Sequence, residues 1–174
     1  GTGGTSATIG RFIRYQRLAS RLCVVDPENS VFLDYFEHRD PTVTSGKGSG
    51  VEGIGRPRVE PSFVPDVVDR MIRVPNAASY AGMRFLETKL GRKYGGSTGT
   101  CVYGAMELAA ELAAAGETGS IVMVAGDSGD RYLDTYYDDA WLAANGYDIA
   151  PYLAQLDATY STCVWASPPS GTST

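Results

Sequence analysis

The chain has 174 residues, which suffice for one ordinary domain that buries about two-thirds of its unfolded surface. The 43% hydrophobic and 20% charged residues are typical of a soluble globular protein, and a formal net charge of −5 argues against nucleic acid or an anionic membrane as main partner. Three cysteines without CxxC spacing predict neither a disulfide framework nor a metal site, so we expect a cytoplasmic protein. No apolar run approaches the length of about 18 residues that spans a bilayer.

The first predicted elements are a glycine-rich loop, a helix and a strand. The chain opens with GTGGTSATIG, and no methionine precedes it, which suggests a truncated or processed chain. Ile9, Phe12 and Ile13 recur at helical spacing and predict one amphipathic helix. The apolar, β-branched residues 21–25 (RLCVV) predict a strand, and DPENS after it predicts a turn.

Strands and helices alternate along the rest of the chain. Residues 71–75 (MIRVP) and 120–126 (SIVMVAG) predict buried strands. Asn76 is expected to cap a helix that runs to Gly91, and Thr100 to begin another that ends near Gly116. This order predicts parallel βαβ units and therefore an α/β fold, with helices covering a parallel-rich sheet. The polar end, ASPPSGTST, predicts a disordered tail.

The opening loop has two interpretations. Consecutive glycines let several N–H groups point into one concavity at the positive end of a helix dipole, and the hydroxyls of Thr2, Thr5 and Ser6 add donors, so the loop could hold a phosphate. A tight glycine turn that only packs a helix on a strand explains the loop as well. No lysine follows as in GxxxxGK[ST], and Ser6 stands where a dinucleotide fingerprint needs glycine, although Asp26 would suit a ribose.

Four motifs in order carry a resemblance to a known family. They are GTGGTSATIGR at the start, VEGIGRPR at 51–58, GGSTGT at 95–100 and VMVAGDSGDRY at 122–132. The chain resembles the C-terminal portion of the cysteine synthase and cystathionine β-synthase family, pyridoxal-phosphate (PLP) enzymes of fold type II with a tryptophan synthase β-like fold. CVVDPENS and DSGDRYLDTYY look closest to actinobacterial S-sulfocysteine synthase or cysteine desulfhydrase-like members. Residues 1–150 are then the C-terminal part of the catalytic fold, and 151–174 a terminal helix and tail.

The resemblance implies which residues hold the cofactor. Its phosphate would be bound by Gly1, Thr2, Gly3, Gly4 and Thr5. Ser128 would hydrogen-bond the pyridine nitrogen, and because a neutral hydroxyl does not keep that nitrogen protonated, the ring is a weaker electron sink that favours loss of the β-substituent. Asp127 and Asp130 could form an acid–base pair, but turn formation and helix capping explain them better. Ser97 and Thr98 would lie near the cofactor, although a helix N-cap explains Thr98 equally well.

The resemblance also implies a substrate side of the site, formed by Gly53, Ile54, Gly55 and Arg56. The glycines would leave room beside the substrate. Arg56 and Arg58 depart from the commoner cysteine synthase pattern. They could pair with an anionic co-substrate, or form salt bridges to Glu52 and Glu60.

The lysine that the family's chemistry requires has no match in this chain. Lys47, Lys89 and Lys93 lie in a glycine-rich loop or at a helix end and are predicted to be surface residues, and His38 an exposed loop residue. The Schiff-base lysine is therefore expected from an N-terminal segment of the same enzyme or from a complementary chain, within a homodimer. No catalytic residue is assigned in this chain.

Together these features predict PLP-dependent β-elimination or β-replacement at cysteine or an activated serine, through an aminoacrylate. The substrate would be a small amino acid. The alternative is a non-catalytic half-enzyme or scaffold subunit that requires a lysine-bearing partner.

Overall fold

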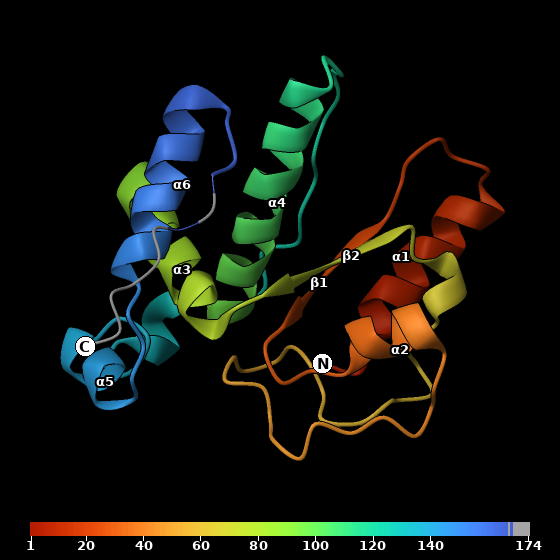
Figure 1. Cartoon of the computed structure of the whole chain (residues 1–174), viewed down its shortest axis with the longest axis horizontal. Helices are drawn as coiled ribbons and strands as arrows, with labels where there is room; N and C mark the ends of the chain where they lie inside the picture. The colour runs from red at the N-terminus through yellow and green to blue at the C-terminus, as the bar shows by residue number, and fades with distance from the viewer. Residues whose placement is uncertain (167, 169–174) are drawn as a thin grey trace. The chain divides into compact units, whose positions relative to one another are not determined.

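The computed structural model describes residues 1–166 and 168, which fall into two compact units, Gly1–Val74 and Pro75–Thr174 (Figure 1). Each unit is described by itself. The first contains α1 (Gly4–Tyr15), β1 (Cys23–Pro27), α2 (Phe32–His38), the 3-10 helix η1 (Pro65–Val67) and β2 (Arg70–Val74). The second contains α3 (Asn76–Leu90), α4 (Gly96–Ala114), the 3-10 helix η2 (Gly129–Tyr132), α5 (Asp139–Ala144) and α6 (Ala150–Thr162).

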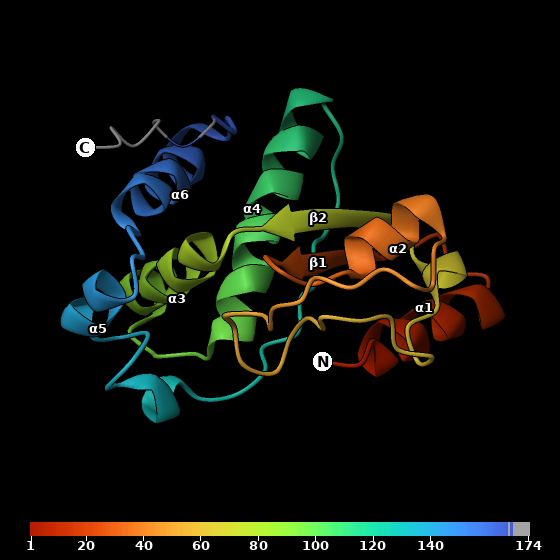
Figure 2. The same cartoon turned by 60° about the horizontal axis from the view of Figure 1, so that its bottom comes forward.

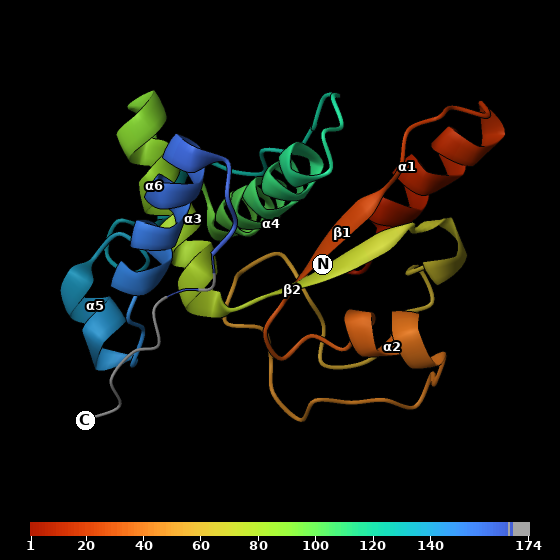
Figure 3. The ribbon, with the colours of Figure 1, turned by 45° about the horizontal axis from the view of Figure 1, so that its top comes forward.

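The first unit is built on two parallel strands. Cys23 of β1 lies opposite Arg70 of β2, and Pro27 lies opposite Val74, which confirms the predicted parallel pairing. Helices α1 and α2 lie on either side of this pair (Figure 3). The strand predicted at 21–25 begins two residues later and includes Asp26, because pairing with β2 sets its limits rather than the local apolar run.

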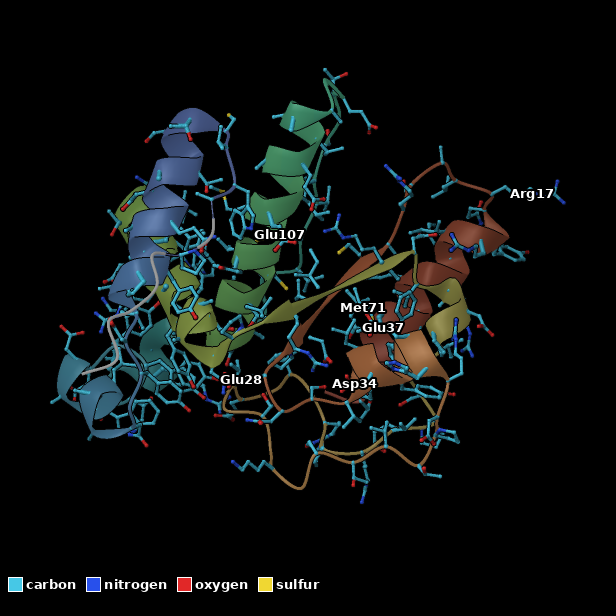
Figure 4. The ribbon with its side chains drawn as sticks, viewed as in Figure 1. Arg17, Glu28, Asp34, Glu37, Met71 and Glu107 are labelled. Atoms are coloured by element: carbon cyan, nitrogen blue, oxygen red, sulfur yellow. The ribbon has the colours of Figure 1, made fainter. Side chains whose placement is uncertain are left out.

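An aromatic core joins α2 to the sheet of the first unit. Phe32 and Phe63 stack with ring centroids 4.5 Å apart, and Val68 and Met71 are buried in the same cluster. Met71, labelled in Figure 4, belongs to β2, so this core ties the sheet to the long irregular segment between α2 and η1.

Helix α1 forms as predicted, but it docks through a different face. Ile13 is buried, whereas Ile9 and Phe12 are 36% and 57% exposed, so only one of the three apolar residues at helical spacing lies in the core. The buried face includes Gly10, where a Cβ would lie only 2.6 Å from Val67 Cγ2. A glycine allows this close approach of helix and η1, which large apolar side chains would prevent.

Three helices form the centre of the second unit. Helices α3 and α4 touch backbone to backbone, since a Cβ on Gly82 would lie 2.3 Å from Gly99 O, and α6 packs against both (Figure 2). Helix α3 forms as expected, but Asn76 is its first residue and Pro75 holds the N-cap position, so the predicted cap by Asn76 is wrong. No side chain caps the helix. Helix α4 begins at Gly96, four residues before Thr100.

The segment 120–126, predicted as a buried strand, is neither a strand nor buried. Val122 is 93% exposed, and Ile121 and Val124 are 39% and 54% exposed. The β-branched residues of this segment are favoured in strands because they pack well against neighbouring strands of a sheet. Within the part of the chain that the structure describes, no strand pairs with this segment, so the prediction is wrong.

The end of the chain contains the predicted terminal helix. Helix α6 covers Ala150–Thr162 and packs against α3, while residues 167 and 169–174 of the predicted disordered tail lie outside the described residues. The assignment of residues 1–150 to one catalytic fold stays a prediction. None of the helices among residues 1–166 combines the length and the apolar character needed to cross a membrane.

Candidate functional site

The opening loop ends in a glycine that no other residue could replace without strain. Gly3 is the N-cap of α1 and has φ 86° and ψ 0°, a left-handed conformation. A Cβ on Gly3 would lie 2.6 Å from Phe63 Cβ, so the loop also presses against the core. The first N–H groups of α1 lack partners within the helix, and its first turn contains no acidic residue. This end of α1 therefore attracts an anion.

The surroundings of the loop fit a phosphate group. A Cβ on Gly4 would meet only Thr2 Oγ1, at 3.8 Å, so the backbone there faces open space, and Thr2 and Thr5 are exposed. Ser62 Oγ donates to Thr2 O at 2.8 Å and anchors the loop. Ser6, expected to add a donor, instead donates its hydroxyl proton back to Gly3 O at 2.8 Å, so this expectation is wrong.

The structure brings the opening loop and the predicted substrate-side segment together in the first unit. Gly1 and the four residues Gly53, Ile54, Gly55 and Arg56 line one cavity of about 360 Å³. The Gly1 nitrogen donates a hydrogen bond to Gly53 O. Gly53 and Gly55 have φ values of 80° and 77°, so the segment follows a course that suits glycine.

Arg56 lies at this cavity with only a long ion pair. A Cβ built on Gly1 would lie 3.9 Å from an Arg56 guanidinium nitrogen. Arg56 Nε is 3.8 Å from Glu60 Oε1, and Arg58 Nε is 3.2 Å from the same oxygen, so the two guanidinium groups share Glu60, one of the two carboxylates that the salt-bridge interpretation named. The Arg56 side chain is 44% exposed and can still approach an anionic ligand.

In the second unit the GGSTGT and GDSG motifs lie against each other. Gly95 N–H donates to Asp127 O at 3.0 Å, and Gly126 N–H donates to Thr98 Oγ1 at 2.9 Å. Thr98 is fully buried and holds this second segment, while Gly95 is the N-cap of α4. Thr98 therefore does not cap the helix, contrary to one of its two interpretations.

Ser128 is exposed and already has a hydrogen-bond partner. Its Oγ donates to Asp130 Oδ2 at 2.7 Å, and the Ser128 side chain is the N-cap of η2. Asp127 accepts a hydrogen bond of 2.6 Å from Tyr132 Oη. Each carboxylate thus accepts from a nearby hydroxyl, and Ser128 rather than either aspartate caps η2. Because a serine has one hydroxyl proton, Ser128 must turn away from Asp130 to donate to a ring nitrogen.

The three lysines have positions that suit surface residues. Lys89 Nζ is 2.9 Å from Asp157 Oδ1, Lys93 pairs with Glu87, and Lys47 is exposed. His38 is exposed as predicted, but it is the last residue of α2 rather than part of a loop.

Two polar residues that we did not assign to the substrate side lie buried next to that segment. Asp26 is 1% exposed and Ser30 2% exposed, and Asp26 accepts from Arg73 at 3.2 Å. Burial raises the pKa of the Asp26 carboxyl, although hydrogen bonds from Ser30 and the charge of Arg73 oppose the increase. Asp34, labelled in Figure 4, lies 3.1 Å from Arg73 on the α2 side. The signal in the sequence was the aspartate inside an apolar strand.

Comparison with known proteins defines the class of protein. The family model described as "Pyridoxal-phosphate dependent enzyme" matches residues 1–127, and the chain belongs to this family. The resemblance, the α/β fold of type II and the PLP cofactor expected from the sequence are thereby confirmed.

Within this family, the chain is similar to several individual proteins. The chain is 54% identical over 165 residues to a Mycobacterium tuberculosis protein named L-cysteine desulfhydrase Cds1, an alignment that covers 95% of this chain and 45% of that protein. It is 29% identical to a putative cysteine synthase of Sinorhizobium fredii, covering 90% of this chain and 44% of the relative. It is 31% identical to cystathionine beta-synthase of Oryctolagus cuniculus, an alignment that covers 84% of this chain and 26% of the relative. The chain thus spans less than half the length of these relatives.

Proposed function

We propose that this chain is part of a PLP-dependent enzyme that acts at the β-carbon of cysteine. The reaction favoured is desulfhydration, in which cysteine and water give pyruvate, hydrogen sulfide and ammonia. The observation that carries the proposal is the 54% identity, over 95% of the chain, to a protein named L-cysteine desulfhydrase. Replacement of the β-substituent of cysteine or an activated serine is the related reaction, supported by the weaker similarity to a putative cysteine synthase.

Each candidate residue has a role that its surroundings permit. When bound, PLP withdraws electrons from the substrate's α-carbon, which allows the α-proton and then the β-substituent to leave. The Gly1–Thr5 loop at the start of α1 would bind the phosphate through its N–H groups and the hydroxyls of Thr2 and Thr5. Ser128 would donate its hydroxyl proton to the ring nitrogen after turning from Asp130.

The substrate would enter the cavity lined by Gly1 and Gly53–Arg56. Gly53 leaves space, since no atom lies within 4 Å of its Cβ position, whereas Gly55 packs against the turn after β1. The Arg56 guanidinium would pair with an anionic group of the substrate or co-substrate. Replacing Arg56 by Gln should raise KM about tenfold for an anionic co-substrate and change kcat less, because a charged hydrogen bond made equally before and in the transition state is lost. An unchanged KM would show that Arg56 does not bind the anionic group.

The Schiff-base lysine is proposed to come from outside these residues. In the second unit, Lys89 pairs with Asp157 and Lys93 pairs with Glu87. Lys47 lies in an exposed loop of the first unit. An N-terminal segment of the same polypeptide or a complementary chain would supply the lysine, in a homodimeric, cytoplasmic enzyme.

The test is the product balance of the PLP-loaded protein with cysteine. Desulfhydration gives sulfide and pyruvate in equal amounts, whereas replacement gives sulfide without pyruvate and consumes an added thiol or other nucleophile. Release of neither sulfide nor pyruvate by protein that binds PLP would refute both reactions.

A further inference from the structure

A buried serine holds the backbone of the substrate-side segment at one defined place. Ser30 lies in the turn after β1 and is 2% exposed. Arg56 N–H donates to Ser30 Oγ at 3.2 Å, and the next residue, Val31, donates its N–H to Arg56 O at 3.0 Å. Both backbone polar groups of Arg56 are therefore held by two consecutive residues of the turn. Such pairing restrains the segment more than one hydrogen bond would.

Buried polar contacts hold the turn that carries Ser30. Asp26 of β1 is 1% exposed and accepts from Leu33 N–H at 2.9 Å and from Arg73 at 3.2 Å. The same Arg73 guanidinium nitrogen also donates to Ser30 O. Arg73 therefore joins the buried aspartate of the sheet to the turn whose hydroxyl accepts from Arg56 N–H.

The same turn also limits the segment sterically. A Cβ on Gly55 would lie 2.7 Å from Pro27 Cγ and 3.0 Å from Ser30 Cβ. No side chain separates the Gly55 backbone from the end of β1. A shift of the turn therefore moves the segment directly, and with it one wall of the cavity.

We propose that Ser30, in the turn that Arg73 holds, is a positioning residue that places Gly53–Arg56 on the substrate side of the cavity. The inference rests on the proposed function, because it assigns this wall to the amino-acid substrate. Ser30 itself need not touch the substrate. Its hydroxyl acts through the backbone of Arg56.

The test compares Ser30→Ala with Thr159→Val in the protein as the cell makes it. Thr159 is 3% exposed, donates its hydroxyl to Gln155 O at 2.8 Å, and lies on α6 of the second unit. Both variants lose one buried hydroxyl. For Ser30→Ala we expect KM for cysteine to rise about three- to tenfold, while kcat and PLP affinity change less than about twofold. The backbone amide of Arg56, which loses its acceptor, should exchange its hydrogen with solvent about tenfold faster. Thr159→Val should leave all four unchanged.

The opposite results overturn the proposal. A KM for Ser30→Ala equal to the wild-type value, or an equal rise in Thr159→Val, would leave Ser30 as a purely structural residue. If Ser30→Ala does not fold, Ser30→Cys keeps the volume with a weak acceptor and should show the same KM rise in smaller measure. If the wild-type protein releases neither sulfide nor pyruvate, the proposed function fails. Faster exchange of the Arg56 amide then still supports positioning, and unchanged exchange overturns it.

Discussion

Substituting Gly3 by alanine tests whether the backbone shape of the opening loop binds the cofactor phosphate. Gly3 has φ 86°, and a Cβ there would lie 2.6 Å from Phe63 Cβ and 2.7 Å from Phe63 Cα. Phe63 is 3% exposed and stacks on Phe32, so it has little room to move. The alanine must therefore either strain the core or change the loop.

The expected cost follows from these two effects. A left-handed conformation costs alanine about 1–2 kcal/mol, and forcing a methyl group into a packed core costs about 1–3 kcal/mol more. A loop that relaxes to avoid about 3 kcal/mol of strain must regain its shape when phosphate binds. Since each 1.4 kcal/mol is a factor of ten, the affinity for PLP should fall about 100-fold.

The assay is PLP binding at equilibrium, followed by absorbance, together with thermal unfolding in the absence of PLP. Gly46→Ala is the matched control, because Gly46 also has a left-handed φ of 66° but has no atom within 4 Å of its Cβ position. It should cost about 1 kcal/mol of stability and leave PLP affinity unchanged. Wild-type affinity in Gly3→Ala, with a melting temperature no lower than that of Gly46→Ala, would refute the reasoning.

Three further predictions concern other residues. Ser128→Ala should lower PLP-dependent sulfide release from cysteine about tenfold through loss of one hydrogen bond, and an unchanged rate would contradict the assigned role. Burial raises the pKa of Asp26 above its ordinary 3.8, against the charge of Arg73, so the folded state binds the proton more tightly than the unfolded state. The free energy of unfolding should therefore fall as pH rises from 3.8 through the raised pKa of Asp26. Denaturant titrations at several pH values should show this fall in the wild-type protein and not in Asp26→Asn. Equal pH slopes in the two proteins would disprove the raised pKa. Burial also raises the pKa of the Cys101 thiol, whereas Cys163 is exposed, so iodoacetamide should modify Cys163 about ten times faster, as peptide mass spectrometry would report; equal rates would argue against this burial.

The segments predicted correctly from the sequence are those whose signal is local. The strand at MIRVP, the helix from Asn76 and the helix end near Gly116 depend on apolar runs and on Gly or Pro punctuation within a few residues. The glycine motifs also carried the family resemblance, because chemistry at a phosphate requires a particular backbone, which only glycine permits at Gly3. The resemblance, and not any pattern of spacing, pointed to Gly1 and to Gly53–Arg56, and the structure places them around one cavity.

The errors occurred where the outcome depends on distant residues. Residues 120–126 have the composition of a buried strand, yet Val122 is 93% exposed, since a strand exists only with a neighbour to pair with. The spacing predicted α1 but not the face through which it packs: Gly10 lies against Val67 of η1, while Phe12 is 57% exposed.

The sequence by itself determined the helices and the two strands that have local signals, and their order predicted the parallel pairing of β1 with β2, because periodicity and glycine placement act over a few residues. The class of cofactor came from the family resemblance that the glycine motifs carry. Only the tertiary structure decided that Asp26 and Ser30 are buried together beside Arg56. Ser30 and Arg56 are 26 positions apart, and nothing in either local sequence specifies the other as a partner. Such contacts arise when the sheet and its core bring the two segments together, where a buried polar group must find a partner to offset the loss of water.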